Sequence, residues 1–195
     1  MEDKRLYIIA GCNGAGKTTA SYAILPHVIG IVEFVNADEI AKGLSPFNPE
    51  DMAIKAGRLM LERINELLDA GKSFALETTL ATRSYIHLVR QARQRGYTVQ
   101  ILFFYLKTVA LAKQRVAERV AQGGHNIPPN VIERRYHAGL RNLLHIFMDE
   151  VDRWVIYDNS DGACREVASG GRAIQTAIKE PTIYLNIQQH ERQRV

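Results

Sequence analysis

Cysteine, tryptophan and long apolar runs are all scarce in this chain of 195 residues. The two cysteines, Cys12 and Cys164, are too few for a disulfide framework and favour a reducing compartment. No apolar run approaches the ~20 residues of a membrane-spanning helix, and the amino terminus lacks the pattern of a secretory signal. We therefore expect a cytoplasmic protein that does not insert into a membrane.

Low-complexity tracts, internal repeats and linkers are also missing from the sequence. With 46% hydrophobic and 24% charged residues the chain can bury a sizeable core, which excludes wholesale disorder and collagen-like or fibrous structure. The formal net charge of +4 favours phosphorylated ligands but is too small by itself to indicate nucleic acid. The length suits one domain, and we predict a single domain over residues 1–195.

Short apolar segments recur along the chain and predict strands. The segment 99–106 is apolar almost throughout, which is typical of a strand near the centre of a parallel sheet with both faces covered. Gly170 and Gly171 are placed to turn a hairpin, and residues 183–187 are expected to form an edge strand. The core strands are expected at 6–10, 32–35, 73–76, 99–106 and 154–157.

Helical patterns lie between these strands, and several carry cap residues. Asn48 and Pro49 suit the start of one helix and Gly71 its end, while Pro26 is expected to stop an earlier helix. The alternation of strands and helices predicts a three-layer α/β fold with a mainly parallel, five-stranded sheet. The helices are expected at 17–24, 49–70, 84–95, 109–121 and 130–148.

Residues 11–18 match the phosphate-binding pattern G-x-x-x-x-G-K-[ST] in full, directly after the first strand and before a helix. Glycines let the backbone curl so that its N–H groups point at a phosphate, and the helix N-terminus adds partial positive charge. Lys17 is expected to reach the β- and γ-phosphates, and Thr18 to hold Mg²⁺. The pattern predicts nucleotide binding by Gly11, Asn13, Gly14, Ala15, Gly16, Lys17, Thr18 and Thr19.

Cys12 lies inside this loop and has two interpretations. Loop positions of this kind contribute backbone N–H groups, so we interpret Cys12 as a spacer. The alternative is a redox-sensitive thiol, because a helix N-terminus favours the thiolate.

Acidic residues follow the second and third strands, at the edge of a parallel sheet where ligands bind. Asp38 is a candidate general base for an attacking hydroxyl group, and the alternative is that Asp38 caps a helix with Glu39 in its first turn. Glu77 ends an apolar strand, where an unpaired carboxylate is costly. We expect Glu77 to bind Mg²⁺ through water, to contact substrate, or to pair with an arginine, and Thr79 is a further candidate substrate contact.

Basic residues cluster in two places. Arg83, Arg90, Arg93 and Arg95 lie on one predicted helix, and we interpret them mainly as a solvated face. The second cluster flanks the glycine pair before His125, which suggests a hinged lid over residues 115–135 that closes on nucleotide phosphates. His125 alone is weak evidence for a functional role. The candidate lid arginines are Arg115, Arg119, Arg134 and Arg135.

Several segments together, in order across residues 6–160, resemble the zeta toxin family of P-loop kinases. They are more closely similar to short bacterial proteins described as zeta toxin family or as predicted ABC-type ATPases. The segments are GCNGAGKTT (11–19), FVNADEIA (34–41), FALETTL (74–80), RVAERVAQGGHNIP (115–128), RRYHAGLRNL (134–143) and VIYDNS (155–160).

The resemblance implies a P-loop nucleotide-kinase-like fold with a helical lid, and ATP and Mg²⁺ as cofactors. Characterised members phosphorylate a sugar hydroxyl of UDP-N-acetylglucosamine and pair with a small antitoxin that blocks the nucleotide site. By similarity, Lys17 and Thr18 hold nucleotide and metal, Asp38 is the catalytic base and Glu77 contacts substrate. The resemblance also implies phosphate contacts from Arg119 and from Arg134 or Arg135. The family has a substrate-contacting arginine, and Arg83 is the arginine of this sequence that lies nearest to that position.

The leading hypothesis is therefore an ATP-dependent kinase acting on a hydroxyl of a small metabolite. A motor or transport ATPase would need a Leu-Ser-Gly-Gly type signature and a hydrophobic strand ending in Asp-Glu, and the sequence has neither. A nucleotide-dependent binding module, such as an RNA-binding one, is supported only by the net positive charge, and nucleic acid is not expected as a partner.

Overall fold

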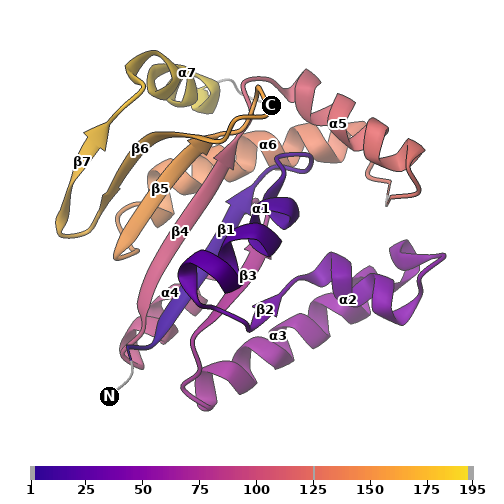
Figure 1. The fold of residues 1–195 in the computed structure, drawn as a ribbon, viewed down its shortest axis with the longest axis horizontal. Helices are drawn as coiled ribbons and strands as arrows, with labels where there is room; N and C mark the ends of the chain where they lie inside the picture. Colours follow the sequence, from indigo (N-terminus) through magenta and orange to yellow (C-terminus); the bar gives the residue numbers. More distant parts are fainter. Residues whose placement is uncertain (1–2, 125, 193–195) are drawn as a thin grey trace.

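A seven-stranded sheet crosses the protein in the computed structural model, which describes residues 3–124 and 126–192. Figure 1 shows α1 in front of this sheet and α4 and α6 behind it, so that helices cover both faces. The strand order is β2-β3-β1-β4-β5-β6-β7. The first five strands in this order pair in parallel, and β6 and β7 each pair antiparallel with the strand before them. The strands are β1 Arg5–Gly11, β2 Phe34–Val35, β3 Phe74–Thr78, β4 Thr98–Tyr105, β5 Arg153–Asp158, β6 Arg165–Gly171 and β7 Ile174–Ile178.

The predicted α/β architecture is confirmed, but the prediction of five strands was wrong because the chain beyond β5 adds an antiparallel hairpin. The predicted hairpin is confirmed, but its turn is residues 172–173: Gly170 and Gly171 end β6, and Gly171 pairs with Ile174 across the turn. The segment 99–106 forms most of β4, the fourth strand in the order, and its residues 101–105 are all buried as expected for the centre of the sheet. At the other edge β2 is shorter than predicted, since Val32 is 83% exposed and pairing with β3 begins at Phe34.

The helices largely follow the predicted pattern. Those predicted at 17–24 and 109–121 have those bounds, and Gly71 has the left-handed φ of 64° that suits the end of a helix. The helices are α1 Lys17–Ile24, α2 Ala37–Leu44, α3 Ala53–Asp69, α4 Tyr85–Gln94, α5 Val109–Ala121, α6 Pro129–Asn142 and α7 Pro181–Arg192. Shorter helical turns are η1 Leu25–Ile29, η2 Pro49–Met52 and η3 Leu143–Phe147.

Three predicted helix boundaries differ from the structure. The predicted helix 49–70 begins as the 3-10 turn η2, with α3 starting at Ala53, and Asn48 makes no side-chain cap bond. Pro26 does not stop the helical path, because the π-helical turn η1 follows α1 directly and continues to Gly30. Proline is accommodated at the start of a helical segment, where its missing N–H would have no partner. The predicted helix 130–148 is likewise divided into α6 and the π-helical turn η3.

The predicted edge strand at 183–187 was wrong, because this segment lies inside α7. The alternating apolar residues Ile183, Leu185 and Ile187 mimic a strand pattern. In the structure Ile187 is fully buried and Tyr184 packs on the core, while Leu185 is 53% exposed. The buried side chains therefore follow the helical spacing, not the alternating one.

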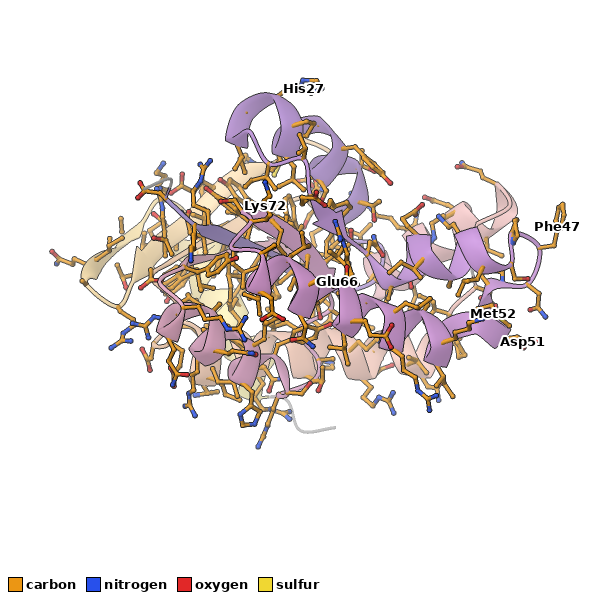
Figure 2. The ribbon with its side chains drawn as sticks, turned by 90° about the horizontal axis from the view of Figure 1, so that it is seen from below. His27, Phe47, Asp51, Met52, Glu66 and Lys72 are labelled. Atoms are coloured by element: carbon orange, nitrogen blue, oxygen red, sulfur yellow. The ribbon has the colours of Figure 1, made fainter. Side chains whose placement is uncertain are left out.

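The segment that carries α2, η2 and α3 extends from the β2 edge of the sheet (Figure 1). Figure 2 shows Phe47 at the outer end of this segment, beside Asp51 and Met52, and the Phe47 side chain is fully exposed. α2 packs against α3, whose Met60 and Ile64 are buried. Because α2 begins directly after β2, the parallel pairing of β2 with β3 places the N-terminus of α2 beside the carboxyl end of β3.

Within residues 3–124 and 126–192, every helix is too short or too polar to cross a lipid bilayer.

Candidate active site

The phosphate-binding loop connects β1 to α1 and has the backbone that its glycines permit. Gly14 and Gly16 both have a φ of 81°, in the left-handed region. A Cβ atom at Gly16 would lie 2.6 Å from Asn159 Nδ2, and one at Gly14 would lie 2.8 Å from the Ala112 carbonyl oxygen. Both glycines are therefore required by space as well as by conformation, and the loop is held closely by β5 and α5.

Lys17 begins α1 and folds back into this loop. Its side chain is buried, and Nζ donates to the Cys12 carbonyl at 3.0 Å. Nζ also lies 3.7 Å from Glu77 Oε1. The ammonium group is thus held at the floor of the site by one backbone carbonyl and one carboxylate.

Glu77, near the end of β3, receives donors from two segments of the chain, the start of α1 and the N-cap of α2. Thr18 Oγ1 donates to both carboxylate oxygens, at 3.1 and 2.9 Å, and Asn36 Nδ2 donates to Oε2 at 3.1 Å. Burial raises the pKa of Glu77 above its ordinary value, the Lys17 ammonium and the Thr18 hydroxyl lower it, and the charge of Asp38 raises it. The carboxylate is therefore paired and still costly to keep charged.

Asp38 does not cap α2, so that alternative interpretation was wrong. The cap is Asn36, whose Oδ1 accepts from the backbone N–H of Asp38 at 2.8 Å and of Glu39 at 3.4 Å. Asp38 lies in the first turn with an exposed side chain. Its carboxylate is free of the capping role and faces the same cavity as the P-loop.

A cavity of about 290 Å³ opens over the P-loop. The P-loop and the start of α1 form its floor, Asp38, Glu39 and Lys42 come from α2, and Arg115 and Arg119 come from α5. Basic side chains facing a P-loop suit the negative charge of a phosphate chain.

A second cavity of about 240 Å³ adjoins the first and is also lined by the acidic residues Asp38 and Glu77. Asn13, Lys17, Asp38 and Glu77 line both cavities. The second cavity is otherwise lined by polar and apolar side chains from α3, β3, the loop after it, α4 and α6. These include Met60, Thr78, Thr79, Thr82, Tyr85 and Arg135.

The predicted lid arginines do not lie together. Arg115 and Arg119 line the P-loop cavity, and Arg115 Nη2 donates to the Ser160 carbonyl at 2.8 Å. Arg135 lines the second cavity and donates to Asn13 Oδ1 at 3.3 Å. Burial lowers the pKa of Arg135, while the charge of Asp38 acts in the opposite direction. Arg134 is exposed and lines neither cavity.

The glycine pair after α5 is a helix end. Gly123 has a φ of 84°, its N–H donates to the Val120 carbonyl, and the Gly124 N–H donates to the Arg119 carbonyl. This pattern is the Schellman motif, which explains both glycines without a hinge. His125 lies outside the described residues.

Three arginines of the other predicted cluster form ion pairs with acidic residues from other elements. Arg90 pairs with Glu150, Arg95 with Asp69, and Arg93 Nε lies 3.4 Å from Asp152 Oδ1. Arg83 is exposed and lines neither cavity, although its neighbours Thr82 and Tyr85 line the second cavity.

Cys12 is a poor candidate for a redox switch. Its side chain is 5% exposed, and burial raises the pKa of its thiol to about 11, although Lys17 and Arg115 lower it. The thiol therefore stays protonated near neutral pH, which is consistent with the spacer interpretation.

Sequence reasoning missed Asn36, Met60 and Tyr85 as site residues. An asparagine directly after a strand and before an acidic first turn is a typical N-cap signal, so Asn36 could have been found. Met60 and Tyr85 follow ordinary helical patterns, and only the packing of α3 and α4 brings them to the cavity.

The residues at the cavity floor fit ATP with Mg²⁺. A hydroxyl and a carboxylate are ligand types that Mg²⁺ prefers, and Mg²⁺ usually keeps several waters and binds substrate phosphates. In keeping with this, no group of three or more His, Cys, Asp or Glu residues among the described ones forms a metal cage.

Solved structures with this fold include a complex called AvrRxo1-ORF1:AvrRxo1-ORF2 with sulphate ions. It aligns with a TM-score of 0.80 at 16% identity over 99% of this chain and 66% of that chain. A structure of the PezAT chromosomal toxin–antitoxin system of Streptococcus pneumoniae aligns with a TM-score of 0.65 at 18% identity, over 84% of this chain and 71% of that one. The chain thus spans about two thirds of the matched chain of that complex.

The fold and the P-loop site define the protein as a P-loop phosphotransferase. A family model described as Zeta toxin matches residues 1–165, and the chain belongs to the zeta toxin family. An uncharacterized protein of Haemophilus influenzae is 29% identical over 136 residues, which cover 70% of this chain and 94% of that protein. The hairpin strand β7 and helix α7 lie beyond the residues that the family model matches.

Proposed function

We propose that the protein transfers the γ-phosphate of ATP to a hydroxyl group of a small metabolite. The observation that carries this proposal is that two cavities share the lining residues Asn13, Lys17, Asp38 and Glu77. A nucleotide on the P-loop places its terminal phosphate at these shared residues, where a ligand in the second cavity also reaches them. Such juxtaposition of donor and acceptor is the main requirement of phosphoryl transfer.

The donor cavity is assigned to ATP. The P-loop amides and Lys17 bind the phosphates, and Arg115 and Arg119 neutralise charge on the transferring group. Thr18, and Glu77 through water, hold Mg²⁺, which when bound supplies further charge neutralisation. A crystal structure of the AvrRxo1-ORF1:-ORF2 complex, which has this fold, was solved with ATP, and this supports ATP as the nucleotide of the present chain.

Asp38 is assigned as the general base. It lines both cavities, it is exposed, and the cap of α2 is supplied by Asn36. A carboxylate at this place accepts the proton of an acceptor hydroxyl as the hydroxyl oxygen attacks the γ-phosphorus, while the bond from the γ-phosphorus to the β–γ bridging oxygen breaks and ADP leaves. Arg135, whose charge interacts with that of Asp38, faces the acceptor side.

The lining of the second cavity favours a hydroxylated acceptor. Thr78, Thr79, Thr82 and Tyr85 contribute hydroxyl groups, and Asp38 and Glu77 contribute acceptors of hydrogen bonds. UDP-N-acetylglucosamine, whose sugar hydroxyl is phosphorylated by characterised zeta toxins, is the first acceptor to test.

Asp38→Asn tests the assignment directly. Because Asn36 caps α2, this change should leave the helix and ATP binding intact, while loss of the base should lower transfer by ~10²–10⁴-fold. The measurement is mass spectrometry of phosphorylated products after incubation with Mg²⁺-ATP and either UDP-N-acetylglucosamine or a metabolite extract. Asp69→Asn, which removes an exposed carboxylate paired with Arg95, is the matched control.

Two results would contradict the proposal. If the wild type binds ATP but yields no phosphorylated product from any extract, the protein is not a metabolite kinase. If Asp38→Asn transfers phosphate at the wild-type rate, Asp38 is not the base, and Glu39→Gln and Glu77→Gln become the variants to compare.

An antitoxin partner is the second part of the proposal. It is supported by the family and by the PezAT neighbour, whose structure is that of a toxin–antitoxin system. Expression of the wild-type protein without its partner should then slow the growth of a bacterial host, and Asp38→Asn should not. Equal growth with both proteins at equal abundance would remove toxicity from the proposal.

A further inference from the structure

Asn36 uses both ends of its side-chain amide within the site. Oδ1 accepts from two N–H groups in the first turn of α2, and Nδ2 donates to Glu77 Oε2 at 3.1 Å. The residue is 6% exposed, so both ends of the amide bind protein groups away from bulk water. A buried amide that is satisfied at both ends has one preferred orientation.

The sheet register explains why Asn36 reaches Glu77. Phe34 pairs with Ala75 and Val35 with Leu76 in parallel β2 and β3, so the next residues along both strands are Asn36 and Glu77. The two side chains thus leave adjacent strand ends together. The residue directly after β2, which also caps α2, therefore contacts the carboxylate that Thr18 and Lys17 contact from α1.

Without Asn36 the Glu77 carboxylate would keep donors from α1 only. Thr18 lies within hydrogen-bond distance of both carboxylate oxygens, so it tolerates rotation of the carboxylate, and the Lys17 ammonium is 3.7 Å away. Asn36 donates to Oε2 alone and comes from a different element than Thr18, so this second donor restrains that rotation. The same side chain holds the N–H of Asp38, so it links the placement of the two acids.

We propose that Asn36 is a positioning residue, whose Nδ2 group fixes the Glu77 carboxylate relative to Thr18 and to Asp38. This inference rests on the proposed function, because it treats Glu77 as part of the Mg²⁺-ATP site. Loss of a residue that orients a group in a metal site typically raises the metal concentration required by about 10–100-fold.

A variant series separates this positioning role from the helix cap. Asn36→Ser keeps an oxygen that caps α2 well but removes the amide donor, and Asn36→Ala removes both. Thr108→Ala removes the cap of α5, where Thr108 Oγ1 accepts from the Leu111 N–H, and serves as the control for cap loss alone. For each protein the melting temperature is measured without ligand, with ATP and EDTA, and with ATP over a Mg²⁺ titration.

We expect Asn36→Ser to melt close to the wild type without ligand and to be stabilised normally by ATP in EDTA. The Mg²⁺ midpoint is the Mg²⁺ concentration at which half of the Mg²⁺-dependent rise in melting temperature is reached. For Asn36→Ser this midpoint should rise at least about 10-fold, and Asn36→Ala should show the same rise together with a lower melting temperature without ligand. Thr108→Ala should melt lower with an unchanged midpoint. A wild-type midpoint in Asn36→Ser would overturn the positioning role and leave a cap only.

Failure of the proposed function gives a different result. If the wild-type protein is not stabilised by ATP at all, the nucleotide site is wrong, and this inference falls with it. If the wild type responds to ATP and Mg²⁺, the comparison of Asn36→Ser with the wild type decides the role of Asn36 alone.

Discussion

The Thr18 hydroxyl donates to both carboxylate oxygens of Glu77 and thereby joins two segments that are 59 residues apart. The contact ties the end of β3 to the first turn of α1. It also keeps a largely buried carboxylate at the floor of the donor cavity, where burial disfavours its charge. A buried charged group at a binding site commonly lowers the stability of the fold while it serves function, and the stability of this protein should therefore depend on the ionisation of Glu77.

Glu77→Gln should change how stability depends on pH. The pKa of Glu77 is raised in the folded protein, so the folded state holds this proton more tightly than the unfolded chain does. Stability from this group is full below the unfolded pKa of about 4.3 and is lost as pH rises through the folded pKa. The free energy of unfolding of the wild type, relative to Glu77→Gln, should therefore fall as pH rises, which urea unfolding at several pH values can measure.

Glu150→Gln provides a control of opposite sign. Its hydrogen bond to Arg90 lowers the pKa of Glu150, so its contribution is present above the unfolded pKa and is lost as pH falls. The effect should be small because the pair is exposed. A pH trend at Glu77 with the sign expected for Glu150 would show that pairing with Lys17 and Thr18 outweighs burial.

Lys17→Ala should abolish tight ATP binding, because we expect the buried Lys17 side chain to be the P-loop group that reaches the β- and γ-phosphates. ATP at about 100 times its dissociation constant should raise the wild-type melting temperature by roughly 5–10 °C, and the variant should lose most of this shift. Lys179→Ala, which removes an exposed lysine paired with Glu166, should keep it. An undiminished shift in Lys17→Ala would count against the nucleotide site.

Cys12 should resist alkylation in the folded protein, because it is buried and its thiol pKa is about 11. At about pH 8, iodoacetamide should label the exposed Cys164 first, and the Cys164→Ser variant should stay almost unlabelled until it is unfolded in urea. Intact-mass measurement over time gives both rates. Fast labelling of Cys12 in folded Cys164→Ser would restore the redox interpretation.

Nucleotide should slow hydrogen exchange at the lid. Arg119 lines the donor cavity, and its carbonyl accepts from Gly124 at the end of α5. A non-hydrolysable ATP analogue should therefore protect the backbone N–H groups of residues 120–124, 126–127 and 130–132, while β7 should exchange equally in both states. Equal exchange of these segments in both states would contradict the closing-lid model. Arg115 and Arg119 would then line the donor cavity without moving when nucleotide binds.

Local patterns allowed much of this protein to be predicted from its sequence. The P-loop is a run of neighbouring residues whose glycines and lysine carry their meaning in order, and α1 and α5 have the predicted bounds because helix signals are also local. The strongly apolar segment 99–106 likewise indicated the centre of the sheet, since only a strand covered on both faces tolerates such a run.

The contacts between distant segments were decided by the tertiary structure alone. Strand order places Asn36 beside Glu77 across 41 residues, and the packing of α6 brings Arg135 to Asn13 across 122 residues. No local pattern distinguishes Arg135 from its neighbour Arg134, because the face that a helix buries depends on what packs against it. The sequence alone thus determined that a nucleotide site exists, whereas the topology of the sheet decided which acid, amide and arginine complete it.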